Sequence, residues 1–283
     1  AEFIYTSNLR NCWLRPFSLI TNGTRRYHEI PVLRDQLNRQ NKTKNRAEKC
    51  LYVYDKAVTD YAFWNQQIEH GNLMISVLKE NSVATFVESI SFDTDHELNT
   101  GVEEYGIYEN SGIKFSIVNY RDPETRKLHR FVTTLPEAIN PGTIAMLYYK
   151  RWTIEKAFNN SKSNLKETKA WSSDNNSLKN QMRLTAMSYN LLRMVEELSK
   201  IQDPELIHPS DKKYTEELEK RQQAAKKRGG FVNPLFFNKR IARISSSTIR
   251  AVQNAIMTGK SLSSFINALV AKLVPRGELI GEH

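Results

Sequence analysis

The sequence has few of the residues that build disulfide frameworks or structural metal sites. Its 283 residues include only two cysteines, Cys12 and Cys50, and six scattered histidines. Neither a Cys-x2-Cys nor a His-Glu-x2-His pattern occurs in it. We therefore expect neither a disulfide-held fold nor a structural zinc site.

Long apolar runs are also absent from the sequence. No stretch approaches the roughly 20 apolar residues that a membrane-spanning helix needs, and the start of the sequence has no signal-peptide pattern. We therefore expect a soluble, cytoplasmic protein without a membrane partner. With 40% hydrophobic residues, the chain can bury a full core and hold more than one structural unit.

Positive charge is in excess, and it is unevenly distributed. The chain has 41 Lys and Arg against 31 Asp and Glu, a formal net charge of +10. Residues 1–50 and residues 201–283 each carry +6, whereas the residues between them carry −2. A basic surface around a less basic centre is typical of an enzyme that binds nucleic acid and holds a metal with acidic residues.

Hydrophobic patterning predicts an α/β fold in four parts. Residues 1–81 alternate strands (2–7, 15–23, 49–55 and 73–81) with helices (28–42 and 60–71), which implies a mixed sheet covered by helices. Residues 82–135 form a β-rich insertion with strands at 84–93, 103–109, 113–122 and 127–135. Residues 136–202 return to helices, with a long amphipathic helix at 177–201 that we assign to core packing. Residues 203–283 are helical and basic, with a charged helix at 211–228 before a Gly-Gly break.

The segment "LYYKRWTIEKAFNNSKSNL", residues 147–165, places charged and aromatic side chains on one predicted helix. Asn140 is suited to cap its start and Pro141 to occupy its first position. At about 100° per residue, an apolar stripe runs beside a polar stripe made of Tyr148, Arg151, Glu155 and Lys162. A solvated face with one Arg151–Glu155 pair is the ordinary interpretation. Tyr, Arg and Lys around a carboxylate favour a second one, in which they hold phosphates beside a metal-binding acid.

Asp55 follows the predicted buried strand at residues 49–55. Strand ends are where α/β sheets place functional groups, although Asp55 is equally suited to cap the next helix. Two carboxylates from a strand end and a helix, such as Asp55 and Glu155, can bind divalent metal for phosphoryl transfer.

The spacing Tyr148-x2-Arg151-x3-Glu155-x6-Lys162, with "RWTIEKAF" at its centre, resembles the YREK signature of bacterial insertion-sequence transposases of the DDE superfamily, in the IS-four-type group. "LYVYDKAVTDYAFWNQQIEHGNLMISVLKEN" resembles the stretch around their second catalytic Asp, and "LITNGTRRYHEI" the segment before it. The resemblance covers about residues 15–200.

This resemblance implies an RNase H-like fold whose three acids bind two Mg²⁺, with Mn²⁺ as a substitute, to cut and join transposon ends. Asp55 becomes the second acid and Glu155 the third, both as metal ligands. Tyr148, Arg151 and Lys162 become contacts to DNA phosphates, and Trp152 is read as packing. The implied partners are double-stranded DNA, as transposon ends and target, and a second copy of the chain in a synaptic complex.

The chain departs from the family in its first acid. Asp35, the one aspartate before Asp55, lies within a predicted helix, and Glu2 has little support. We therefore expect a transposase that lacks its N-terminal part, including the first strand and its Asp, or a decayed copy. A metal-dependent nuclease of the same fold and a catalytically inactive DNA-binding remnant remain as alternatives. A basic structural or RNA-binding protein is disfavoured because no RNA-binding motif is present.

Overall fold

The computed structural model describes residues 2–9, 13–20, 29–43, 49–55, 60–80, 82–152, 154–155, 157–159, 169–170, 172–202, 209–233, 236 and 257–258. The helices expected between the Gly-Gly break and residue 273 lie almost wholly outside these ranges. The first elements in chain order are β1 (Glu2–Ser7), β2 (Leu14–Ile20), α1 (Glu29–Thr43), β3 (Leu51–Val53), α2 (Tyr61–Glu69) and β4 (Leu73–Val77). Next come β5 (Thr85–Ser89), the 3-10 helix η1 (Glu97–Asn99), β6 (Val102–Asn110), β7 (Ile113–Arg121) and β8 (Leu128–Thr133). The last are α3 (Pro141–Lys150), α5 (Asn175–Gln202) and α6 (Pro209–Lys226).

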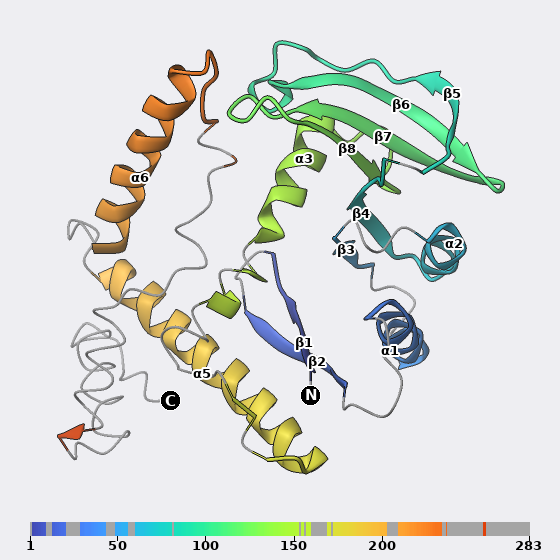
Figure 1. Cartoon of the computed structure of the whole chain (residues 1–283). Coiled ribbons are helices and arrows are strands. Elements are labelled where there is room, and N and C mark those ends of the chain that lie inside the picture. Colours follow the sequence, from blue (N-terminus) through green and yellow to red (C-terminus); the bar gives the residue numbers. More distant parts are fainter. Residues whose placement is uncertain are drawn as a thin grey trace, which may run out of the picture.

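A six-stranded mixed sheet in the order β3-β4-β8-β7-β6-β5 is the larger of two sheets in the described residues and lies at the upper right of Figure 1. β3 and β4 are parallel, whereas β8 joins β4 antiparallel through Ile75 and Thr133. The expected α/β fold with a mixed sheet is thus confirmed. The strands expected at 82–135 are also confirmed, and they continue the sheet that β3 and β4 begin.

The first two strands pair with each other in a separate antiparallel sheet. α5 packs on this pair through a cluster that contains Tyr5, Leu14, Met182 and Tyr189. The side-chain amide of Asn190 on α5 bonds both the N–H and the C=O of Leu14, each at 2.9 Å. The expected packing role of this long helix is therefore confirmed.

Helices cover both faces of the six-stranded sheet because side chains alternate along each strand. On one face, Met74 and Val132 pack with Leu37 of α1 and with Phe63 and Trp64 of α2. On the other face, the α3 residues Ile144, Ala145 and Tyr148 pack with a set of sheet residues that includes Ile75, Val118 and Phe131. The sheet thereby holds α3, which carries Tyr148 and leads into Arg151, against a rigid surface.

The start of α3 has the expected cap. The Asn140 side chain accepts a hydrogen bond from the Gly142 N–H, and Pro141 occupies the first turn. The end of α3 differs from the single helix expected through residue 165. α3 ends at Lys150, Arg151 lies in a turn, and the described residues between 152 and 159 are helical. The N–H of Arg151 bonds the C=O of Tyr148, a 3-10 spacing that eclipses these two side chains.

Candidate nucleic-acid and metal site

Arg151 is a mostly buried cation in contact with two aromatic rings. Its guanidinium carbon lies 5.4 Å from the centre of the Tyr148 ring and 5.5 Å from that of the Trp152 ring. The tightened turn at the end of α3 produces this arrangement by bringing Tyr148 over Arg151. Attraction between a cation and aromatic faces holds the guanidinium in a defined place.

Glu155 pairs with this guanidinium. Arg151 Nη1 donates a hydrogen bond of 2.8 Å to Glu155 Oε1, and the two side chains are 14% and 38% exposed. Ala157, two positions later, is fully buried in the cluster between α5 and the β1–β2 pair. Packing against α5 and the β1–β2 pair thus fixes the backbone near Glu155, while the Glu155 carboxylate remains accessible.

Asp55 comes two residues after β3, at the carboxyl end of that strand. The Tyr54 N–H bonds the C=O of Ile75 at 2.9 Å, and Ser76 Oγ donates to the C=O of Asp55 at 3.0 Å. These bonds to β4 extend the strand pairing and present the Asp55 side chain at the surface. The helix that follows has Asp60 as its cap, which accepts from the Phe63 N–H. The interpretation of Asp55 as a helix cap is therefore wrong.

Asp55 and Glu155 both act electrostatically on the pair formed by Arg151 and Tyr148. Burial lowers the Arg151 pKa, but the charges of Tyr148, Asp55 and Glu155 and the hydrogen bond to Glu155 outweigh it, so the net shift is upward. Burial raises the pKa of Tyr148, Arg151 lowers it, and Asp55 and Glu155 raise it further. The structure thus brings four of the five predicted site residues into one electrostatic group, from α3, the turn after it and the end of β3.

The fifth predicted residue, Lys162, lies outside the described residues. Asp35, which the sequence makes a poor candidate for the first acid, is exposed in the middle of α1. Within the described ranges, no group of three or more His, Cys, Asp and Glu side chains is placed to hold a metal ion. The metal-ligand assignment of Asp55 and Glu155 stays a prediction.

The chemistry of Asp55 and Glu155 nevertheless fits a hard divalent cation. Mg²⁺ takes oxygen ligands and keeps several waters, so it needs accessible carboxylates rather than a closed cage. Asp55 is exposed and Glu155 partly exposed, which meets this requirement. To bind the metal, Glu155 would have to weaken its hydrogen bond with Arg151.

Two features of the site have no clear signal in the sequence. Trp152, read as packing from the motif, has 49% of its surface exposed and lies beside the Arg151 guanidinium. Arg151 Nε is buried, and no described residue accepts a hydrogen bond from it. Neither the exposed ring nor the unused donor follows from residue spacing, because both depend on the turn that ends α3.

Comparison with known families identifies the family of the chain. The model of the transposase DDE domain family matches residues 16–191, which include Asp55, Tyr148, Arg151 and Glu155. The chain belongs to this family, and its mixed six-stranded sheet flanked by helices is consistent with the RNase H-like fold of such transposases. No curated protein matches the chain. Among the described residues, no helix combines the length and apolar composition that a bilayer crossing requires.

Proposed function

We propose that this chain derives from a cut-and-paste DNA transposase that cleaves and joins transposon ends by two-metal phosphoryl transfer. The observations that support it best are the Arg151–Glu155 hydrogen bond and the charge of Asp55, which acts on Arg151 from a segment nearly a hundred positions away. A lone solvated ion pair on a helix does not require a third charge from the end of β3.

In this proposal, Asp55 and Glu155 hold Mg²⁺, or Mn²⁺ in its place. The bound metals would stabilise charge on the attacking and leaving oxygens of an in-line displacement. The contribution of the chain is to fix the two carboxylates, one through the β3–β4 pairing and one through the packing around Ala157.

Arg151, Tyr148 and Lys162 contact DNA phosphates in the proposed complex. The buried Nε of Arg151 supports this role, because an unpaired buried N–H is costly and a phosphate oxygen would accept from it. The rings of Tyr148 and Trp152 keep the guanidinium oriented before DNA arrives. Less ordering is then required on binding.

The test is the salt dependence of DNA binding by the Arg151→Ala/Lys162→Ala variant. A labelled duplex of mixed sequence and about 30 base pairs serves as probe, because the slope of log affinity against log salt falls by about 0.9 for each phosphate that is no longer neutralised. We expect weaker binding and a slope reduced by the equivalent of about two phosphates.

The matched control is Lys114→Ala/Lys179→Ala, which removes the same charge from exposed positions on β7 and α5. We expect this control to bind nearly as the parent chain does. If both double variants had the same duplex affinity and the same salt slope, the polar stripe would be only a solvated helix face.

We also propose that the metal centre is incomplete in these 283 residues, because the first acid is not identified among them. A homodimer would bring two transposon ends together in a synaptic complex. A cleavage assay separates the leading proposal from two alternatives. These are a catalytically inactive DNA-binding remnant and a nuclease of the same fold.

A further inference from the structure

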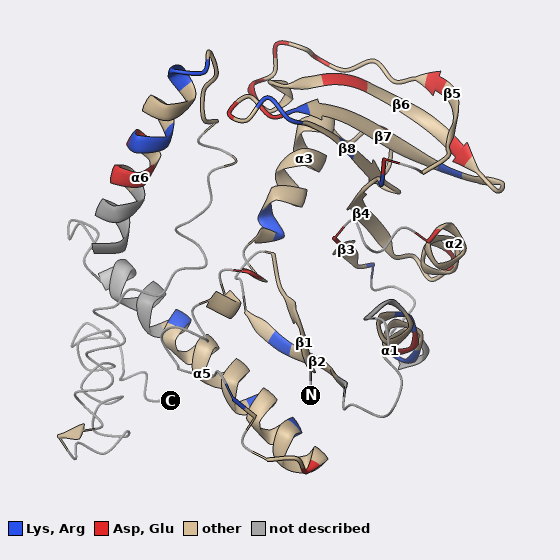
Figure 2. Ribbon diagram, in the orientation of Figure 1, with Lys and Arg blue, Asp and Glu red and all other residues tan. Residues whose placement is uncertain are grey.

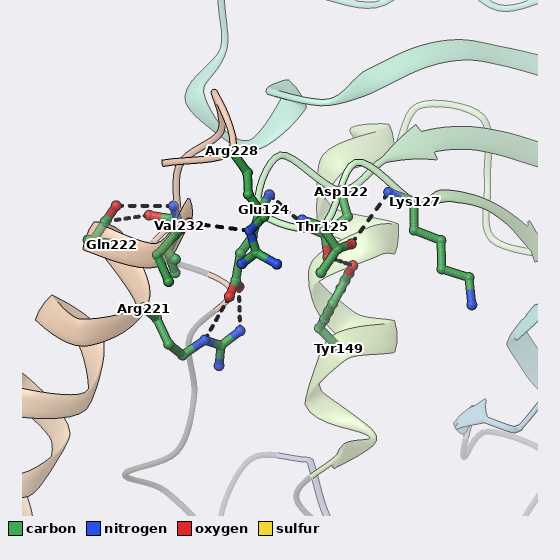
Figure 3. Close-up of polar contacts among 10 residues, drawn as sticks. Asp122, Glu124, Thr125, Lys127, Tyr149, Arg221, Gln222, Arg228 and Val232 are labelled. Carbon is green, nitrogen blue, oxygen red and sulfur yellow. Dashed lines mark hydrogen bonds and ion pairs between the residues drawn. The ribbon is translucent and has the colours of Figure 1, made fainter. Parts of the chain in front are cut away.

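The end of α6 is held against the turn between β7 and β8, although nearly a hundred positions separate them in the sequence. Arg221 on α6 forms a two-pronged ion pair with Glu124 in the turn, with Nε at 2.9 Å from Oε1 and Nη2 bonded to Oε2 (Figure 3). The Glu124 side chain is only 14% exposed. A planar guanidinium bonded twice to a carboxylate fixes both distance and orientation.

Backbone contacts bring the two segments closer still. After the helix, the chain folds back, and the Gln222 amide bonds the backbone C=O and N–H of Val232 at 2.7 and 3.1 Å. The Phe231 N–H then donates to the Pro123 C=O at 3.3 Å. Gly230 approaches that same carbonyl so closely that a Cβ would lie 2.3 Å from it. A side chain at position 230 would therefore push the segments apart.

The same turn is anchored to α3, the helix that leads into the candidate site. Tyr149 donates a hydrogen bond of 2.7 Å to Asp122 Oδ2, and Figure 3 shows the phenol reaching the turn from α3. Burial, together with the Asp122 carboxylate, raises the pKa of Tyr149, so the phenol stays protonated as a donor. The end of α6 is thus connected through the β7–β8 turn to Tyr149, the residue that directly follows Tyr148 of the candidate site.

The carboxylates at this junction are engaged, whereas cations face solvent. Besides Tyr149, Asp122 accepts from the backbone N–H groups of Glu124 and Thr125 at 2.7 and 3.0 Å, and Glu124 is bound by Arg221. Blue segments at the end of α6 and at the turn lie next to each other in Figure 2. Four exposed cations of these segments make up what we call the α6–turn surface: Arg126, Lys226, Lys227 and Arg228. Lys127 is also exposed, and its side chain points away from α6 in Figure 3.

No ion pair involving these four residues is found among the described residues. The nearby acidic residue Glu103 is paired with Arg121 of β7. Bringing unpaired like charges together costs electrostatic free energy, which a polyanion would offset. A rigid junction that turns its acids inward and its cations outward is suited to a phosphate backbone.

We propose that the α6–turn surface binds the sugar–phosphate backbone of duplex DNA, outside the site around Arg151. This inference rests on the proposed transposase function, and it assigns a role to the basic region that follows α5. The surface contacts phosphates without reading bases, so it adds affinity that is independent of sequence and sensitive to salt.

The experiment compares the parent chain with the variant Arg126→Ala/Lys226→Ala/Lys227→Ala/Arg228→Ala on the mixed-sequence duplex. We expect affinity at moderate salt to fall roughly tenfold or more, and the salt slope to decrease by about 0.9 for each phosphate that the variant no longer neutralises. The control removes four exposed cations elsewhere: Arg39, Lys49, Lys114 and Lys179, each changed to Ala. It should keep nearly the parent affinity.

A second variant separates the two segments without changing charge. Gly230→Ala places a Cβ against the Pro123 carbonyl, so we expect several-fold weaker duplex binding at constant net charge. Its neighbour Gly229→Ala is the control: it adds strain at φ +72°, but the new Cβ meets no atom within 4 Å. Parent affinity in Gly230→Ala would overturn the requirement for a joined surface.

The outcomes distinguish this inference from the proposed function. If the four-residue variant binds as its control does while Arg151→Ala/Lys162→Ala loses affinity, DNA binding by the α6–turn surface is rejected and the transposase proposal is retained. If the parent chain does not bind duplex DNA at all, both fall. A loss seen with single-stranded DNA of equal length and not with duplex would also overturn the assignment.

Discussion

Arg151 illustrates how one residue can be prepared for a ligand before the ligand arrives. Its guanidinium contacts two rings, is paired with Glu155 and has a buried Nε for which no described residue accepts. Burial and pairing together restrict the side chain to one orientation. A residue that served solubility alone would not need these restraints.

At this scale, the exposed Trp152 ring yields a prediction. Trp152→Ala should weaken duplex binding several-fold, because the ring helps to orient Arg151 through a cation–π contact. Trp152→Phe should retain part of the affinity. The measurements are duplex affinity and the free energy of unfolding.

The comparison for this prediction is Trp13→Ala, which removes a ring of similar exposure, 38%, just before β2. A buried Trp typically costs about 3–5 kcal/mol when truncated. If Trp152→Ala lost that much stability and kept parent affinity, Trp152 would be a packing residue after all.

At the scale of elements, α3 connects the sheet to the site and its N-terminus is crowded. The Gly142 N–H is bonded by Asn140 Oδ1 and by Asn99 Oδ1, both at 2.9 Å. A Cβ on Gly142 would lie 2.0 Å from the C=O oxygen of Leu98 in η1. The helix is therefore fixed at its start by a backbone contact that only glycine permits.

Gly142→Ala should destabilise the fold by about 3 kcal/mol, because neither the helix nor η1 can move without losing these bonds. Duplex affinity should fall as well, since Tyr148 and Arg151 depend on where α3 lies. Chemical unfolding and DNA titration measure the two effects.

Gly112→Ala is the matched glycine variant for this test. Gly112 has φ +77° and no atom within 4 Å of its added Cβ, so strain alone should cost about 1–2 kcal/mol. A smaller loss in Gly142→Ala than in Gly112→Ala would contradict the close contact between α3 and η1.

At the scale of the whole molecule, the sheet and its helices bring distant charges together. Asp55 and Glu155 come from opposite sides of the long stretch that contains β4 to β8. Arg221 and Glu124 meet from equally distant segments. The first junction involves the end of α3, and the second involves the β7–β8 turn, which Tyr149 of α3 binds through Asp122. The candidate site and the α6–turn surface therefore both depend on the position of α3.

The catalytic prediction belongs to this scale. Two-metal transfer holds its metals about 3.5–4 Å apart with carboxylates, and Asp55 and Glu155 contribute only −2 against the +4 of two such ions. We expect the 283 residues to bind DNA without cleaving it in Mg²⁺ or Mn²⁺. The measurement is nicking of supercoiled DNA, with Glu155→Gln as a control that should match the parent.

Metal-dependent nicking by the parent chain that disappears in Glu155→Gln would show that a first acid is present after all. Asp35→Asn and Glu2→Gln would then be the variants to compare. Nicking that survives Glu155→Gln would instead contradict the assignment of Glu155 as a metal ligand.

Local patterns in the sequence were sufficient for most of the elements. The cap at Asn140 and Pro141, the strand before Asp55 and the strands between 82 and 135 depend on neighbouring residues, and each formed where its pattern indicated. The strand before Asp55 is, however, a half-buried strand at one end of the six-stranded sheet and not the buried strand that was expected. The motif spacing around Arg151 and Glu155 likewise identified two side chains that hydrogen-bond to each other. The one helix expected from 147 to 165 was interrupted, because the Tyr148–Arg151 turn tightens to a 3-10 spacing.

The sequence by itself thus determined the α/β pattern, the family and the identity of the charged residues at the candidate site. The tertiary structure alone decided that Trp152 is exposed, that Tyr149 bonds Asp122, and that Arg221 brings the end of α6 to the β7–β8 turn. The physical reason is range. Helix and strand patterns arise from contacts within a few positions, whereas hydrogen bonds and ion pairs between residues 27 and 97 positions apart exist only once the sheet and α3 have packed.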